Sequence, residues 1–195
     1  MIDRDVNIVQ KSDQRQKANI IWLIACSCCK PTHEYIALIY NCYYMHPVTD
    51  TWQISNRINL YLLEPIEEQH LSDVSASKGR TVGEQFAHLH NVRLMWLKAS
   101  APELMNGLQK IEKENISKEQ LKESLIKSAE AVSQLLEKGM TEGKIKGFKP
   151  HPTAFLAYLI AHERHHRGQI ILSLKQAGHS LDKKVLFGIW EWGSR

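Results

Sequence analysis

Apolar residues recur every three or four positions over four long segments of the chain, which is the spacing of amphipathic helices. The segments cover residues 50–66, 81–100, 117–143 and 152–178. No segment of useful length alternates apolar and polar residues as a strand does, and no internal repeat is visible. Four such helices pack most simply as an up-and-down bundle, although the stretch between the second and third is long enough for a crossover connection. The pattern therefore predicts an all-α four-helix bundle.

Capping signals mark the ends of the first two helices. Asp50 or Thr51 is predicted to cap the first helix, and Pro65 is expected to kink or break it. Thr81 and Glu84 form a capping box, in which each side chain accepts a hydrogen bond from the other residue's backbone amide. This box predicts a second helix that runs to about residue 100.

The last two helices carry similar signals. Ser117, three residues before a glutamine, repeats the capping box, and Gly139 or Gly143 is predicted to end the third helix. Pro152 suits the first turn of the fourth helix, since its backbone angle is already helical and it lacks an amide hydrogen. Gly178 suits the left-handed position just after the helix end.

Residues 1–44 lack a sustained helical period and contain all the cysteines of the chain. These are Cys26, Cys28, Cys29 and Cys42. We predict that residues 1–48 form a poorly ordered or dispensable extension, with Met45 as an alternative start, and that the domain spans residues 49–195. A lipoprotein signal ending at Cys26 is one alternative, disfavoured by the long charged lead. A zinc cluster is another, disfavoured because no second well-spaced cysteine pair is present.

The segment after Gly178 is too apolar to be left in water. Its large apolar residues are Val185, Leu186, Phe187, Ile189, Trp190 and Trp192. We predict that this segment packs across the bundle, and a contact in a homodimer is the alternative.

Composition limits the classes of partner. The 195 residues are 43% hydrophobic, which is enough to build a core. Lys and Arg number 25 against 21 Asp and Glu, an excess too small and too scattered for a nucleic-acid footprint. The apolar run 20–29 is too short to span a bilayer, so we predict a cytoplasmic protein. Since no cysteine follows residue 42, any metal in the domain must be held by histidine and carboxylate.

The fourth helix contains the main candidate for such chemistry. Successive helical residues turn by about 100°, which places five residues on one narrow stripe. They are Phe155, Leu159, His162, His166 and Gln169. Two imidazoles one turn apart have Cβ atoms about 6 Å apart and can converge on one ion. The alternative is a pair of core histidines held by hydrogen bonds, but one metal ion satisfies both rings at once.

A third ligand is expected from a facing helix. On the second helix, His88 lies at the edge of the apolar arc and can reach inward, whereas His90 lies on the opposite shoulder and is predicted to be a surface or interhelical residue. His88 is therefore the predicted partner of His162 and His166.

The segments Phe86–Leu89 with Arg93 and Trp96, and His162–Ile170, resemble the DinB superfamily of metal-binding helical bundles. The resemblance covers about residues 49–195. In that family one histidine of the second helix and two of the last helix bind a divalent metal, and the matching residues are His88, His162 and His166.

This resemblance implies a small-molecule enzyme with a divalent metal, and imidazole ligands favour zinc, nickel or iron. Three histidines leave a coordination position open, where the ion can activate water or bind a low-molecular-weight thiol as its thiolate. The family includes thiol-dependent transferases and isomerases, so we expect an S-transferase or isomerase. The alternative is a non-catalytic, stress-related metal-binding bundle.

Three further residues are weaker candidates for substrate or cofactor contacts. Glu84 and Tyr158 each lie one turn before a predicted ligand, and either could orient that ligand or touch substrate. Glu84 also has its capping role, and Tyr158 is an ordinary aromatic at the core edge. Arg93 falls within an apolar arc, where a charge needs a partner, and we favour a structural ion pair over an anion site.

The sequence from His162 to His166 also satisfies the HExxH motif of zinc proteases, in which Glu163 would be the general base. Such enzymes present the substrate along a strand, and none is predicted here. Glu163 also points about 80° away from the ligand stripe. A metallohydrolase is therefore the less favoured alternative.

Overall fold

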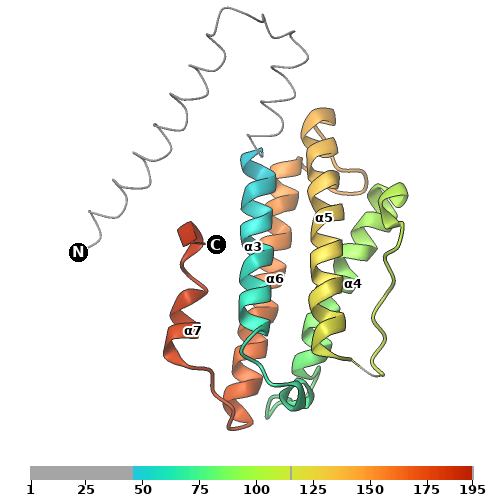
Figure 1. Ribbon diagram of the computed structural model, residues 1–195. Helices are drawn as coiled ribbons and strands as arrows, with labels where there is room; N and C mark the ends of the chain where they lie inside the picture. The colour runs from blue at the N-terminus through green and yellow to red at the C-terminus, as the bar shows by residue number, and fades with distance from the viewer. Residues whose placement is uncertain (1–45, 115, 195) are drawn as a thin grey trace, which may run out of the picture. The chain divides into compact units, whose positions relative to one another are not determined.

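The computed structural model describes residues 46–114 and 116–194, and no β-strand is found in these residues (Figure 1). The four long helices are α3 (Pro47–Leu63), α4 (Val82–Ser100), α5 (Lys118–Glu142) and α6 (Pro152–Gln176). Shorter elements are η1 (Glu68–Ser72), η2 (Pro102–Met105), α7 (Lys183–Gly188) and η3 (Trp192–Ser194). The predicted all-α four-helix bundle is thus confirmed. The hypotheses about Cys26, the other cysteines and the extension fall on residues 1–45, outside the described residues.

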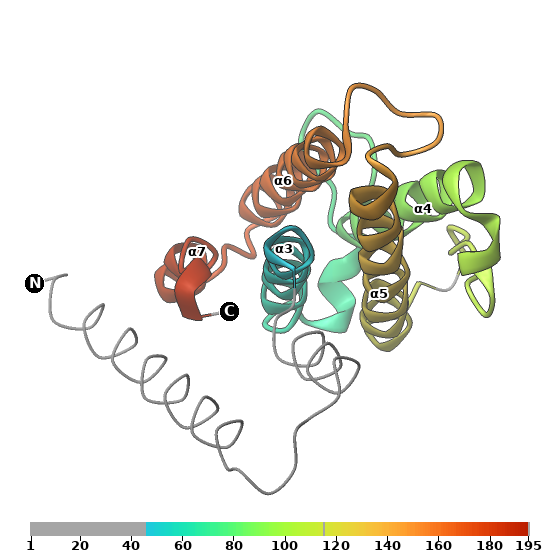
Figure 2. The same cartoon turned by 90° about the horizontal axis from the view of Figure 1, so that it is seen from above.

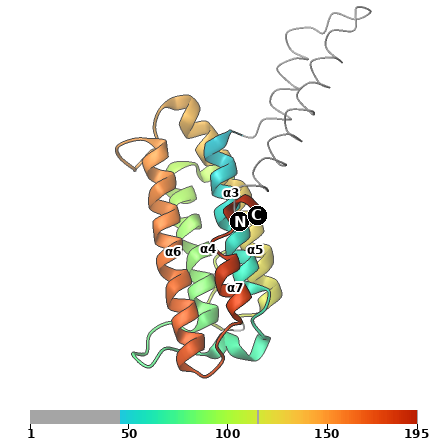
Figure 3. The ribbon, with the colours of Figure 1, turned by 90° about the vertical axis from the view of Figure 1, so that its left-hand side faces the viewer.

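The chain direction differs from a simple up-and-down bundle. Figures 1 and 3 show that α4 and α5 run in the same direction, because the connection between them returns along the bundle. Figure 2 shows the four helices end-on; α3 packs against α5 and α6, and α4 packs against the same two helices. The simplest expectation was therefore wrong, and the crossover alternative is correct.

Side chains of α4 hold this crossover in place. The side-chain amide of Asn91 donates to the carbonyl of Ile111 at 2.9 Å and accepts from its amide at 3.0 Å. His90 is buried and lies between two backbone carbonyls, Gln109 at 2.9 Å and Ser124 at 3.0 Å. It is thus an interhelical residue, one of the two roles expected for it. Because Ile111 is also buried, the returning segment is fixed by both packing and hydrogen bonds.

The start of α3 differs from the prediction. His46, and not Asp50 or Thr51, caps the helix, and its Nδ1 accepts from the Val48 amide at 3.2 Å. Pro47 occupies the first helical position, which it favours because it has no amide to satisfy. At the other end the helix stops at Leu63, before Pro65.

The other predicted caps are present. In the capping box of α4, the Glu84 amide donates to Thr81 Oγ1 at 3.2 Å and the Thr81 amide donates to Glu84 Oε2 at 2.9 Å. The hydroxyl of Ser117 accepts from the Gln120 amide at the start of α5, so Ser117 caps the helix, but the complete capping box formed at Thr81 is not repeated there. Gly143, not Gly139, ends α5 with φ of 71°, a left-handed angle that glycine adopts without strain.

The core is filled in two clusters along the bundle axis. The cluster nearer the α3–α4 connection includes Leu62, Val82, Phe86, Leu121 and Ile170. The other includes Trp52, Leu97, Val132, Phe155 and Leu159. On α6, His162 and His166 come from positions between these clusters, whereas His88 on α4 lies between Ala87 and Leu89 of the first cluster. Packed apolar layers therefore hold the two helices at a fixed separation.

The C-terminal segment lies on the bundle, as predicted. The backbone of Lys184 in α7 accepts a hydrogen bond from the Tyr61 hydroxyl of α3 at 3.4 Å. Trp190 receives the guanidinium of Arg164 over its ring at 3.7 Å. Ile189 is buried, whereas Phe187 remains 72% exposed. None of the described helices is both long enough and apolar enough to cross a membrane.

Candidate metal centre

Helices α4 and α6 bring the three predicted histidines together. His88 comes from α4, and His162 and His166 lie one turn apart on α6. The ring centroid of His88 lies 5.3 Å from that of His162 and 4.6 Å from that of His166. One ring nitrogen from each residue lies within 4.8 Å of the other two. We call these residues the three-histidine centre.

The spacing of the nitrogens fits a metal ion. The Nε2 atoms of His162 and His166 are 3.2 Å apart. Two nitrogens at about 2.05 Å from a tetrahedral zinc ion would be about 3.3 Å apart. His88 needs only a small side-chain movement to close the set, since its ring already meets His166 edge-on. The residues present could therefore hold a divalent ion without rearranging either helix.

The environment keeps the imidazoles neutral, which is the form that binds metal. Burial lowers the pKa of His88 to about 4, and the positive charge of Arg80 and the proximity of His162 add to the effect. Burial and the neighbouring His162 likewise lower the pKa of His166 to about 4. The pKa of His162 is also lowered, again mainly by burial. Above its pKa each ring presents a lone pair that a metal can accept.

Two glutamines fix the orientation of His166. Its Nδ1 lies 2.7 Å from Gln85 Oε1 and 3.0 Å from Gln169 Oε1. The amide nitrogen of Gln169 donates to His165 Nε2 at 2.9 Å, which turns the Gln169 oxygen toward His166. His166 Nδ1 therefore carries the proton, and its Nε2 lone pair faces His162. This is the arrangement in which an outer hydrogen bond sets the tautomer of a metal ligand.

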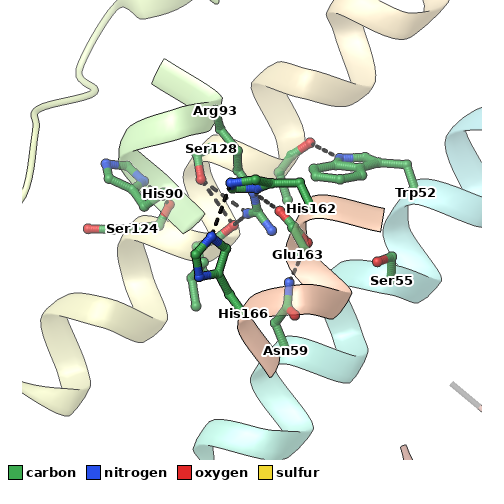
Figure 4. Close-up of polar contacts among 12 residues, drawn as sticks. Trp52, Ser55, Asn59, His90, Arg93, Ser124, Ser128, His162, Glu163 and His166 are labelled. Carbon is green, nitrogen blue, oxygen red and sulfur yellow. Dashed lines mark hydrogen bonds and ion pairs between the residues drawn. The ribbon is translucent and has the colours of Figure 1, made fainter. Parts of the chain in front are cut away.

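A buried polar network lies directly behind the centre (Figure 4). Arg93 of α4 is fully buried, and its Nε donates to Glu163 Oε1 at 2.7 Å. Its Nη1 donates to the Leu125 carbonyl of α5 at 2.8 Å. The structural ion pair favoured for Arg93 is therefore present. The pair joins α4 to the residue next to His162, so it helps hold the ligand-bearing helices together.

The network continues to α3 through the second oxygen of Glu163. The side-chain amide of Asn59 donates to Glu163 Oε2 at 2.7 Å, and Asn59 Oδ1 accepts from Arg167 Nη1 at the same distance. Burial lowers the pKa of Arg167 to about 10, so it stays charged at neutral pH. All four long helices thus contribute to this network.

These contacts argue against the HExxH interpretation. Glu163 is 1% exposed, and its two oxygens accept one hydrogen bond each, Oε1 from Arg93 and Oε2 from Asn59. A general base must reach a water at the metal. Glu163 instead faces the bundle interior on the far side of the ligand stripe, as its helical position predicted.

The surface beside the centre includes a pocket of about 340 Å³. It is lined by His88, Ala87, Asn91 and Ile111, with charged groups at its rim that include Arg80 and Lys113. Glu84 also lines it and lies 3.4 Å from Lys113. The hydrogen bond from the Thr81 amide, aided by Lys113, lowers the pKa of Glu84. Its capping role is therefore clear, and contact with a substrate stays a prediction.

Tyr158 lies next to His162 on α6. Its ring stacks on His162 with centroids 6.2 Å apart and meets Trp96 edge-on at 5.7 Å. Phe148 and Phe155 complete this aromatic group. Tyr158 is 37% exposed, so it lies at the outer edge of this aromatic group with its ring against that of His162. Its contact with a substrate is also still a prediction.

Sequence reasoning missed several residues that support the site. Gln85 and His88 are three residues apart on α4, so they share a face, and this was a usable signal. Arg167 follows Glu163 by four residues on α6, which is the spacing of a helical ion pair. Asn59 gave no such signal, because its partners come from another helix.

The fold and site define a class: an all-helical bundle with an inward three-histidine cluster that could hold a divalent ion. The family comparison names that class, since the DinB family matches residues 45–183, and the chain therefore belongs to the DinB family. Comparison with curated proteins gives no match, and comparison with solved structures gives none either.

Proposed function

We propose that the three-histidine centre binds one divalent ion, zinc, nickel or iron, and that the protein uses it on a small-molecule substrate. The observation that carries the proposal is the convergence of three neutral imidazoles, with 3.2 Å between two of their nitrogens. When bound, the ion would supply a Lewis acid with an open position for water or a thiol. Within the DinB family, this favours a thiol-dependent S-transferase or isomerase.

Different residues of the chain would have different roles at this site. His88, His162 and His166 hold the ion, while Gln85 and Gln169 keep the proton of His166 on Nδ1. The ring of Tyr158 lies against that of His162. The pocket beside His88 supplies room for a small substrate. Because no cysteine follows residue 42, the domain itself offers no nucleophilic thiol, which fits a thiol supplied from outside.

Metal content of the purified, untagged chain tests the proposal. Wild type is compared with the double variant His162→Ala/His166→Ala by elemental analysis after equilibrium dialysis. His151→Asn is the matched control, since it changes a histidine that caps α6 to another good capping residue. We expect the double variant to bind one equivalent fewer than the wild type and the control. Equal metal content in all three would overturn the proposal.

Cobalt spectroscopy tests the open position. Addition of a small thiol to the cobalt-loaded chain should produce a thiolate-to-cobalt charge-transfer band that the double variant lacks. The cysteines before residue 43 are identical in both proteins, so the difference spectrum isolates the three-histidine centre. Bound metal with no thiol band and no turnover of esters or amides would favour the non-catalytic, stress-related bundle.

A further inference from the structure

A second group of metal-ligating side chains lies outside the three-histidine centre. It consists of His70 in η1, Asp73 just after η1 and His179 just after α6, and we call it the end cluster. One possible ligand atom from each residue lies within 4.8 Å of the others. Figures 1 and 3 place the α3–α4 connection and the end of α6 at the same end of the bundle. The cluster therefore joins segments that are more than 100 residues apart in the chain.

Its nitrogens face a common oxygen. His179 Nδ1 lies 2.6 Å from Asp73 Oδ2, and His70 Nδ1 lies 3.7 Å from the same oxygen. The two imidazole rings stack with centroids 3.7 Å apart and 30° between their planes, so one ring must rotate for both Nδ1 atoms to bind the same ion as Asp73. His179 and Asp73 now contact each other directly through this short hydrogen bond. A divalent ion could replace it if that distance lengthened to about 3 Å, the separation of neighbouring ligands in a zinc site.

The backbone holds each ligand in place. The Asp73 amide donates to the His70 carbonyl at 3.2 Å, and the Asp73 carbonyl accepts from Val82 at the start of α4. The His179 amide donates to Leu174 at 2.9 Å while Gly178 donates to Lys175, which together form a Schellman motif. Three positions fixed by their own backbone hydrogen bonds lose little conformational freedom when they bind an ion.

The surroundings also fit a metal ligand set. The other nitrogen of His70, Nε2, lies 3.7 Å from the Glu67 carboxylate, which is close enough for electrostatic attraction but too long for a hydrogen bond. Asp73 is only 12% exposed, so its charge is partly shielded from water. Two imidazoles and a carboxylate favour zinc, cobalt or nickel over calcium or magnesium, which prefer oxygen ligands.

We propose that the end cluster is a second divalent-metal site, in which His70, Asp73 and His179 bind one ion and tie the α3–α4 connection to the end of α6. The site is structural in effect, because an ion bound only by the folded chain stabilises the folded state. It uses none of the residues of the three-histidine centre, so it stands independently of the proposed function.

The test is a zinc titration of the full chain by calorimetry and by equilibrium dialysis. His179→Gln removes one ligand of the end cluster at a position whose side chain is 41% exposed, so the core is unaltered. His151→Asn is again the control, about 40 Å away at the far end of α6 by the helical rise. We expect His179→Gln to bind one equivalent of zinc fewer than wild type and control. Asp73→Asn should show the same loss.

Thermal unfolding gives a second readout. Saturating zinc should raise the Tm of wild type by more than that of His179→Gln, while the two metal-free proteins unfold within a few degrees of each other. If His179→Gln and wild type bind the same number of zinc ions, the end cluster is only a hydrogen-bonded contact and the proposal is overturned.

The two sites can fail separately. In the His162→Ala/His166→Ala variant, the end cluster should still bind one equivalent that the further change His179→Gln removes. Loss of zinc only with His179→Gln would support the end cluster and reject the three-histidine centre. Loss only with the double variant would do the reverse.

Discussion

The three-histidine centre and the end cluster offer similar ligand atoms, but the protein builds them in different ways. The first lies within the bundle, where burial lowers the pKa of His88 and His166 to about 4 and a charged network stands behind them. The second lies at the bundle end, on a 3-10 helix and a helix cap, with His179 41% exposed. Helix packing positions the first and local backbone hydrogen bonds position the second. The comparison predicts that the two respond to different substitutions.

The largest effect is expected from the network behind the three-histidine centre. Glu163→Gln leaves Arg93 buried without a counter-charge, and breaking a buried pair in this way costs about 3–5 kcal/mol of unfolding free energy. Urea denaturation of the metal-free protein measures this loss. The variant should also bind less metal at the three-histidine centre, because α4 and α6 lose a contact between them, while zinc at the end cluster is unchanged.

A matched surface pair provides the control. Glu123 and Lys127 lie 3.0 Å apart on α5 with both side chains more than half exposed, so Glu123→Gln should cost less than about 1 kcal/mol. If Glu163→Gln loses no more unfolding free energy than Glu123→Gln, the buried network contributes little to holding the helices of the three-histidine centre together.

The second prediction concerns pH. In the metal-free protein, His88 and His166 have pKa values near 4, below their ordinary value of 6.5. As the pH falls, these two histidines are therefore protonated in the unfolded chain before they are protonated in the folded one. Their contribution to the free energy of unfolding, complete above pH 6.5, is progressively lost between pH 6.5 and 4. Urea midpoints over this range should fall steeply for wild type and less for His88→Gln/His166→Gln. His151→Asn should show the same change of urea midpoint with pH as wild type. An equal change in all three proteins would show that burial of His88 and His166 does not lower stability at acidic pH.

How far the sequence predicts each site follows from the same comparison. The stripe containing His162 and His166 obeys helical periodicity, so these two residues were predicted as ligands from their spacing. His88 was predicted because its edge position lets it reach the same two residues. The end cluster has no such period. His179 meets Asp73 only because a left-handed glycine turns the chain at the end of α6, and 106 residues separate the two in sequence.

Helix ends and connections show a similar limit. The capping box at Thr81 and the left-handed Gly178 are local signals, and both were predicted correctly. The parallel course of α4 and α5 was predicted only as the crossover alternative, because it depends on Asn91 and His90 holding the returning segment from a distance of about 20 residues. The cap at His46 was missed because the polar residues Asp50 and Thr51 resemble a later start.

The third prediction distinguishes the orientation of His166 from its binding of the metal at the three-histidine centre. Gln85→Leu removes the 2.7 Å hydrogen bond to His166 Nδ1 but leaves all three ligands in place. Loss of such an outer partner typically lowers metal affinity about 10–100-fold, so the variant should bind one ion more weakly at unchanged stoichiometry. Competition with a chromophoric chelator measures this change. The end cluster serves as an internal reference, since its affinity should be the same in both proteins.

The smallest effect is expected at the turn that carries His179. Gly178 has φ of 92°, so Gly178→Ala places a side chain in a left-handed conformation at a cost of about 1 kcal/mol. The variant should lose zinc affinity at the end cluster, because relief of the strain moves His179 away from Asp73, while the three-histidine centre is unaffected. Gly168→Ala, on the same helix with open space at its Cβ and ordinary helical angles, should instead gain about 0.5–1 kcal/mol. A loss of zinc affinity in Gly178→Ala that Gly168→Ala does not show would tie the end cluster to the cap geometry. Equal zinc affinity in the two variants would show that the turn does not position His179.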